Sequence, residues 1–235
     1  MTLRGILRLI AAAPLLIVHL LFWAIARLFG REQMVVMSFL GSLGRLLGLR
    51  VRTEGVPVRG AVLIVANHIS WLDILALGGE VPCRFIAKSE IARWPLVGWL
   101  AALGRAVFVA RDRRSAARAQ ADAVTTALHE PHPVVLFAEG GTGDGVTVTP
   151  FRASLFASAV EAGAAVQPVA IDYGPNRGRL AWPSGQSFGP EAKRLINRHG
   201  KLPVTIRFLP PLDAGTLDRK ALAVEAHGAV VGALS

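Results

Sequence analysis

After Arg52 the chain alternates short apolar runs with helical stretches, and this alternation constrains the fold more than any other feature. The expected strands are mostly apolar and four to seven residues long: Ala61–Ala66, Arg84–Ala87, Ala106–Val109, Val134–Phe137, Ala165–Ile171 and Val204–Phe208. The expected helices lie between or after them, at Leu72–Leu77, Leu96–Leu103, Ser115–Leu128, Ala153–Ala162 and Leu217–Val231. Continuous apolar strands separated by helices are typical of a mainly parallel sheet covered on both faces. We therefore predict an α/β domain over residues 53–235, with the Gly- and Pro-rich segment Gly174–Gly189 as a long connection within it.

The first 52 residues differ from the rest. Leu9–Ala26 contains no Lys, Arg, Asp or Glu, and Met34–Leu49 has apolar residues at helical spacing on one face. Residues 1–52 hold seven Arg and one acid, Glu32. We predict that residues 1–52 form a membrane-associated pair of helices, with the arginines among lipid headgroups. Two alternatives are a secretory signal ending near Ala24–Ala26 and a pair of ordinary core helices.

Composition favours a membrane surface over nucleic acid. The net charge is +10, while hydrophobic residues make up 52% of the chain and the mean hydropathy is +0.46. An apolar and basic chain fits an anionic membrane, whereas nucleic-acid binders are usually polar, with basic residues interleaved with exposed aromatics. Cys83 is the single cysteine, so no internal disulfide is possible, which fits the cytoplasmic side of a bacterial-type inner membrane.

The segment Asn67–Asp73 follows the first expected strand of the domain and carries candidate catalytic groups. A carboxylate that accepts a hydrogen bond from one ring N–H of His68 would fix its tautomer, leaving the other nitrogen to act as a general base. Asp73 is placed to be that carboxylate. The spacing alone also fits an ordinary loop histidine and a first-turn aspartate near a helix dipole. Sites in parallel sheets lie at the carboxyl ends of strands, and Glu139 follows another apolar run in the same way.

Other catalytic classes find less support in the sequence. The six histidines have no metal-ligand spacing, and there is no Gly-x-Ser-x-Gly motif of a serine hydrolase. The glycine-rich stretch 140–145 does not fit the dinucleotide-binding pattern. We expect neither a metal nor a cofactor.

Four blocks in order, Asn67–Asp73, Ala106–Arg111, Phe137–Thr142 and Val166–Val169, resemble the motifs of the lysophosphatidate-type glycerolipid acyltransferases. That family has a His followed after four residues by Asp, an apolar strand ending in Arg, a Phe-Pro-Glu-Gly-Thr-Arg loop, and Val-x-Pro-Val. The resemblance covers about residues 55–175 and, through the two leading apolar helices, extends to the N-terminus.

The resemblance implies acyl transfer from a thioester, acyl-ACP or acyl-CoA, to a lysolipid hydroxyl, with His68 as base and Asp73 as its orienting partner. It implies further roles for four positions: an acceptor pocket shaped by Glu139 and Gly140, an anion ligand at Arg111, and a fixed turn near the site at Pro168. Backbone N–H groups of the glycine-rich loop would be available to an anion.

The third block departs from the family pattern. Gly141 stands where the family has threonine, and Thr142 stands where it has arginine, a natural bidentate phosphate ligand. The tail of the block, with Asp144-Gly145 and Pro150–Phe156, resembles the branch that acylates lyso-ornithine lipid. There Asp144 would bind the ammonium of a zwitterionic headgroup, and Arg152 or Arg111 its carboxylate. The alternative for Asp144-Gly145 is a simple turn.

The leading hypothesis is therefore a membrane-associated O-acyltransferase with lyso-ornithine lipid as acceptor. The first alternative is a 1-acyl-sn-glycerol-3-phosphate acyltransferase that makes phosphatidic acid. The second is a non-catalytic lipid-binding protein of the same fold. The expected partners are membrane lipids, the lysolipid acceptor and an acyl carrier protein or coenzyme A thioester, with no nucleic acid.

Overall fold

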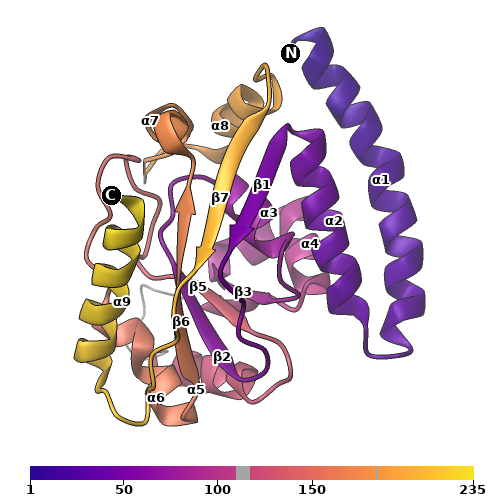
Figure 1. Ribbon diagram of the computed structural model, residues 1–235. Coiled ribbons are helices and arrows are strands. Elements are labelled where there is room, and N and C mark those ends of the chain that lie inside the picture. The colour runs from indigo at the N-terminus through magenta and orange to yellow at the C-terminus, as the bar shows by residue number, and fades with distance from the viewer. Residues whose placement is uncertain (110–116, 184) are drawn as a thin grey trace.

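The computed structural model describes residues 1–109, 117–183 and 185–235, with only the backbone of residues 117–120 (Figure 1). Its centre is a seven-stranded sheet of order β1-β7-β6-β2-β5-β3-β4. The strands are β1 Leu49–Glu54, β2 Val62–Ala66, β3 Arg84–Lys88, β4 Val107–Val109, β5 Val134–Phe137, β6 Ala165–Asp172 and β7 Leu202–Phe208. β6 and β7 pair antiparallel, and the other paired strands run parallel. The expectation of a mainly parallel α/β sheet is confirmed.

Helices cover both faces of the sheet, and each face has its own apolar core (Figure 1). The α-helices are α1 Leu3–Arg27, α2 Glu32–Leu46, α3 Leu72–Gly78, α4 Pro95–Leu103, α5 Ala117–Leu128, α6 Ala157–Ala162, α7 Arg177–Leu180, α8 Phe188–Ile196 and α9 Arg219–Leu234. Short 3-10 helices are η1 Ser89–Arg93, η3 Ala153–Phe156 and η4 Gly174–Asn176. One core contains residues of α3 and α8 and the other contains residues of α6 and α9, so β2, β5 and β6 are buried between two layers. This accounts for their continuous apolar sequences.

The N-terminal helices pack side by side at one flank of the domain (Figure 1). α1 is long and apolar enough to cross a membrane, and none of its most apolar window is buried within the protein. Its first turns are nevertheless tied to the α/β domain: Arg8 donates to the carbonyl oxygens of Ile196 and Arg198 at 2.7 and 2.8 Å. The interpretation of these helices as ordinary core therefore does not hold for α1.

The structure differs from the sequence expectations in two places. β1 was not expected, and the boundary placed at Arg52 falls inside it, so residues 49–52 pair with β7 in the sheet. The arginines of β1 interrupt the apolar run by which the other strands are predicted. They are tolerated because β1 lies at the edge of the sheet, where charged side chains reach solvent. The connection expected at Gly174–Gly189 contains α7 and the start of α8.

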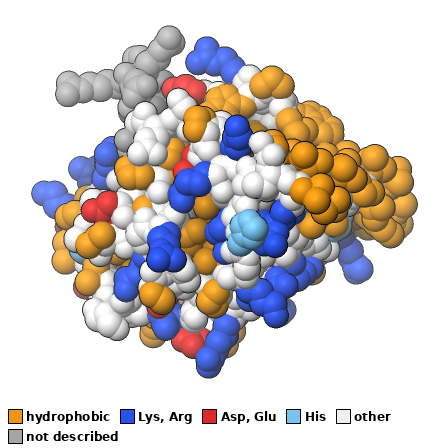
Figure 2. All heavy atoms as spheres, turned by 90° about the horizontal axis from the view of Figure 1, so that it is seen from above, with side chains coloured by type: hydrophobic (Ala, Val, Ile, Leu, Met, Phe, Trp, Pro, Cys, Tyr) orange, Lys and Arg blue, Asp and Glu red, His pale blue; other side chains and the backbone are white. Residues whose placement is uncertain are grey.

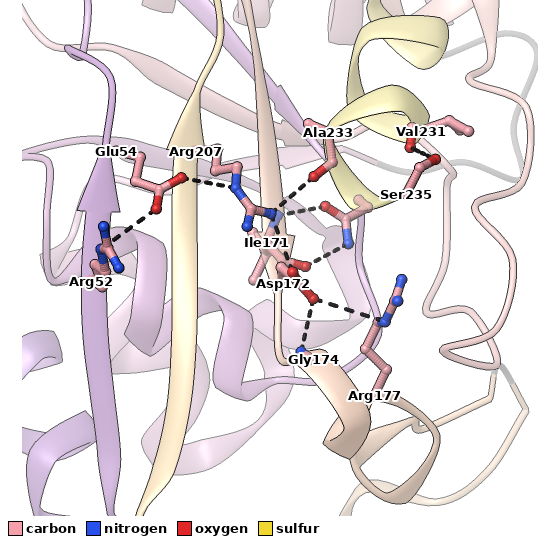
Figure 3. A network of polar contacts seen from close by, with 11 residues as sticks. Arg52, Glu54, Ile171, Asp172, Gly174, Arg177, Arg207, Val231, Ala233 and Ser235 are labelled. Atoms are coloured by element: carbon pink, nitrogen blue, oxygen red, sulfur yellow. Dashed lines mark hydrogen bonds and ion pairs between the residues drawn. The ribbon is translucent and has the colours of Figure 1, made fainter.

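Arg207 of β7 joins the parts of the sheet that run in opposite directions (Figure 3). Its guanidinium contacts the carboxylate of Glu54 in β1 at 2.9 Å and that of Asp172 in β6 at 3.1 Å, and it donates to the carbonyl oxygen of Ala233 at 2.9 Å. These contacts fix the carboxyl end of β6, where the chain next enters the candidate site.

Candidate active site

The loop between β2 and α3 is held against the end of β6 by the side chain of Asn67. Its amide nitrogen donates to the carbonyl oxygen of Ile171 at 3.0 Å, and its amide oxygen accepts from the Ile171 N–H at 2.8 Å. This pair of bonds continues the sheet pairing beyond Ala66, where β2 ends. Asn67 is buried, so the position of the next residue, His68, is set by the sheet itself.

His68 and Asp73 form the dyad that the sequence predicts. Nδ1 of His68 lies 2.8 Å from Oδ2 of Asp73. The same oxygen accepts from the backbone N–H groups of Ile69 and Ser70 at 2.8 and 2.9 Å. The Asp73 side chain is fully buried, whereas 14% of the His68 side chain is exposed. A carboxylate at Nδ1 favours the tautomer whose lone pair is on Nε2, which is the form a general base needs.

Tyr173 completes the environment of Asp73 and was missed from the sequence. Its hydroxyl donates to Oδ1 of Asp73 at 2.7 Å, and the ring is buried. Burial, followed by the charge of Asp73, raises the pKa of Tyr173 well above its usual range, so the phenol remains a donor. Both oxygens of Asp73 are thus hydrogen-bonded, which fixes the carboxylate in place. The signal available in the sequence was that this residue, the single tyrosine of the chain, directly follows β6.

The Glu139 side chain connects two loops by hydrogen bonds to each of them. Its Oε1 accepts from the backbone N–H of His68 at 2.8 Å. Its Oε2 accepts from the N–H and the hydroxyl of Thr149 at 2.8 and 2.9 Å. Because the side chain is buried and each oxygen has a partner, Glu139 positions the catalytic loop relative to the loop that follows β5.

The ring of His68 is also fixed by stacking. It lies parallel to Phe137, the last residue of β5, with ring centroids 3.8 Å apart and an interplanar angle of 9°. Hydrogen bond and stacking together leave the imidazole little freedom to rotate.

The loop from Gly140 to Pro150 folds back over His68. The N–H of Gly143 donates to the carbonyl oxygen of His68 at 2.8 Å, and the Thr142 hydroxyl donates to the carbonyl oxygen of Trp182. Gly140 has φ +84°, and a Cβ built there would lie 2.7 Å from Nε of Arg152, so glycine allows Arg152 to cross the loop. The N–H of Gly140 donates to the carbonyl oxygen of Phe137 at 3.2 Å. The amides of Gly140 and Gly143 are therefore used inside the protein rather than presented to an anion.

Asp144 and Arg152, the charged residues expected to meet the acceptor, are both exposed. The Asp144 carboxylate accepts from the N–H groups of Val146 and Thr147 at 2.8 and 3.1 Å, and these bonds lower its pKa. Asp144-Gly145 thus forms the turn that the alternative interpretation predicts, with Gly145 at φ +74°. Forming a turn does not prevent an exposed carboxylate from also binding a cation.

Two other predicted positions are Arg111 and Pro168. Arg111 lies outside the described residues. The expectation that Pro168 forms a turn near the site is wrong: Pro168 is buried in the middle of β6, opposite Val65 of β2. The Leu209 N–H donates to the Pro168 carbonyl oxygen at 3.0 Å, and the Leu209 carbonyl oxygen accepts from the side-chain amide of Gln167 at 3.1 Å. Proline is tolerated there because the Gln167 amide supplies the donor that the proline nitrogen lacks. In the part of the chain that the structure describes, no group of three or more His, Cys, Asp or Glu is placed to hold a metal ion.

Comparisons with known proteins agree with the geometry. The family profile described as Acyltransferase matches residues 48–172. The chain is 41% identical to the lyso-ornithine lipid O-acyltransferase of Brucella abortus over 199 residues, 77% of this chain and 74% of that protein. It is 37% identical to the 1-acyl-sn-glycerol-3-phosphate acyltransferase of Neisseria gonorrhoeae over 196 residues, 82% of this chain and 77% of that protein. In fold it is similar to the crystal structure of the 1-acyl-sn-glycerophosphate (LPA) acyltransferase PlsC from Thermotoga maritima, with a TM-score of 0.69, 23% identity, and coverage of 98% and 96% of the two chains.

Proposed function

The chain belongs to the acyltransferase family, and we propose that it moves a fatty acyl chain from a thioester to the free hydroxyl of lyso-ornithine lipid. Membership of the family makes it an enzyme of the acyltransferase class. The observation that carries the proposed chemistry is the 2.8 Å contact between His68 Nδ1 and a buried, fully hydrogen-bonded Asp73.

In the proposed reaction, Nε2 of His68 accepts the proton of the acceptor hydroxyl while the hydroxyl oxygen attacks the thioester carbonyl. The tetrahedral intermediate collapses, the carbon–sulfur bond breaks, and the imidazolium of His68 returns the proton to the departing thiolate. Asp73 stabilises the imidazolium between the two steps. The products are the ester and a free thiol, and the acyl group never bonds to the protein. The donor is acyl-ACP or acyl-CoA, and no further cofactor is needed.

The choice of acceptor rests on the loop after β5. Thr142 stands where the family carries a phosphate-binding arginine, and its hydroxyl is engaged with Trp182. Asp144 and Arg152, exposed and of opposite charge, suit a headgroup with one ammonium and one carboxylate. Relatives named as lyso-ornithine lipid acyltransferases from Brucella abortus and Pseudomonas aeruginosa, the latter 36% identical, support the same acceptor.

A second candidate acceptor is 1-acyl-sn-glycerol 3-phosphate, because the gonococcal relative at 37% identity carries that name. A non-catalytic lipid-binding protein would have no need of a histidine aligned by a buried carboxylate. We further propose that residues 1–52 dock the enzyme on the inner membrane, with the α/β domain on the cytoplasmic side, because α1 exposes its apolar surface.

One experiment tests the activity and the acceptor together. Membranes containing the full chain receive radiolabelled acyl donor with either lyso-ornithine lipid or lysophosphatidate, and a His68→Ala variant is assayed in parallel. We expect faster labelling of lyso-ornithine lipid, lost in the variant. Faster labelling of lysophosphatidate would favour the second candidate, and no transfer to either acceptor with either thioester would overturn the enzymatic proposal.

A further inference from the structure

A hollow of about 730 Å³ lies between α7, α8 and the start of β7. Its lining includes four cationic side chains, Arg179, Arg194, Arg198 and Lys201, and one carboxylate, Glu191. Figure 2 views the molecule from this end and shows Lys and Arg side chains over the surface, with the apolar N-terminal helices at one side. The hollow is thus a basic cavity beside an apolar surface.

Most of the positive charge in this cavity is not neutralised by an acid. Glu191 is engaged by Arg194 through two contacts of 2.5 and 2.7 Å. The Arg198 guanidinium donates to the carbonyl oxygens of His199 and Gly200 at 2.8 and 3.0 Å, which are dipoles rather than charges. Within the described residues, no carboxylate forms an ion pair with Arg179, Arg198 or Lys201.

The first turns of α1 bring another cation to the edge of this cavity. A Cβ built on Gly48 would lie 2.9 Å from Nη2 of Arg198 and 3.4 Å from Nη2 of Arg8, so the two guanidinium groups meet around this glycine. Arg8 is itself held by backbone carbonyl oxygens at the end of α8. Like charges brought together without a counter-ion repel one another, and a bound anion would relieve that repulsion.

The cavity and the catalytic loop lie on either side of one short segment. Leu180, Ala181 and Pro183 line the cavity, while the N–H of Trp182 donates to the carbonyl oxygen of Ile69 at 2.8 Å. His68 and Asp73 do not line the cavity. A ligand bound here would therefore sit beside the reacting groups without occupying their place.

We propose that this cavity binds the phosphate group of an anionic membrane phospholipid. Arginine pairs bind phosphate oxygens through planar, bidentate contacts. The exposed apolar surface of α1 starts beside the cavity, so the acyl chains of such a lipid would lie along that surface while its phosphate entered the cavity. The same chemistry could instead receive the phosphates of coenzyme A or free phosphate, and the test separates these sources. The inference does not depend on the acceptor or on catalysis.

The test uses the full chain in a non-ionic detergent and measures binding by titration calorimetry. The probes are dihexanoyl phosphatidylglycerol, dihexanoyl phosphatidylcholine, inorganic phosphate and coenzyme A. The cavity variant is Arg179→Gln with Lys201→Gln, because both residues are exposed and their side chains have no hydrogen bond or ion pair whose loss would unfold the described part of the protein. The matched control is Arg59→Gln with Lys220→Gln, which removes the same charge from the opposite end of the sheet.

We expect saturable binding of one phosphatidylglycerol, with much weaker binding of phosphatidylcholine. The cavity variant should weaken phosphatidylglycerol binding about 25-fold, since each basic side chain near an anionic lipid contributes roughly a fivefold gain. The control should change it less than threefold. Equal losses in both variants, equal binding of the two lipids, or tighter binding of coenzyme A or phosphate that the cavity variant abolishes would each overturn the proposal. His68→Ala should bind phosphatidylglycerol as the wild type does, so a failed acyltransferase assay leaves this result independent.

Discussion

The loops after β2 and after β5 lie against each other but are built differently. In the first, Asn67, His68 and Asp73 are held by hydrogen bonds to the sheet, to each other and to buried partners. In the second, Asp144 and Arg152 reach solvent from a loop whose backbone is fixed by turns and by Glu139. The difference separates two tasks: the first loop fixes the proton-transferring group, and the second presents charges that can select a headgroup.

The largest loss of rate is expected from removing the imidazole of His68 in the first loop. His68→Ala removes the general base, so the acyl transfer rate should fall roughly 100- to 10,000-fold. Radiolabelled acyl transfer in membranes with matched protein content measures it. His129→Ala, at an exposed position after α5, is the control and should keep the wild-type rate. A His68→Ala enzyme as fast as wild type would remove the proposed mechanism.

Removing the Glu139 carboxylate, which connects the two loops by hydrogen bonds, should give the next largest loss of rate. Glu139→Gln keeps the size of the side chain but turns an amide NH₂ toward groups that are themselves donors, at either His68 or Thr149. Losing a hydrogen bond to a charged group costs about 1.5–3 kcal/mol, so we expect a 10- to 100-fold lower rate and a lower Tm. Glu225→Gln, on the exposed face of α9, should leave both unchanged. Unaltered activity and Tm would show that the loops are positioned independently.

Tyr173→Phe should remove one hydrogen bond to Asp73 without removing any reacting group. Asp73 keeps its three other donors, so we expect about a tenfold lower kcat with little change in KM. In a His68→Ala background the same substitution should have no further effect, because it acts through the imidazole. An equal loss with and without His68 would indicate that Tyr173 matters only for packing.

The same tyrosine gives a prediction on stability against pH. Its pKa is raised in the folded protein, so the phenol stays protonated there while the unfolded chain begins to ionise near pH 10. The contribution of the protonated Tyr173 to the free energy of unfolding is complete below that pH and is lost as the pH rises further. The free energy of unfolding should therefore fall more steeply above pH 10 in the wild type than in Tyr173→Phe. Parallel curves for the two proteins would contradict the assignment.

The two loops also differ in how far the sequence predicts them. His68 and Asp73 are close in sequence and sit after a continuous apolar strand, so local pattern and topology together place them. Tyr173 is 100 residues from Asp73 and meets it only because β6 lies beside β2 in the sheet. Glu139 is predictable as a site residue, but its role in connecting the two loops depends on Thr149, which no motif indicates. The in-strand position of Pro168 depends on the contact between the Gln167 amide and the Leu209 carbonyl oxygen, which exists only in the assembled sheet.

The smallest expected change in rate is the one that best tests acceptor selection by the second loop. Asp144→Asn removes the charge but keeps an oxygen that can accept from Val146 and Thr147, so the turn should persist. An exposed ion pair contributes about 0.2–1 kcal/mol, so kcat/KM for lyso-ornithine lipid should fall up to about fivefold, with that for lysophosphatidate unchanged. Asp144→Arg should enlarge the fall for lyso-ornithine lipid, because it repels the ammonium. Full activity of Asp144→Arg on lyso-ornithine lipid would reduce Asp144 to a turn residue and leave Arg152 as the charge of this loop that meets the headgroup.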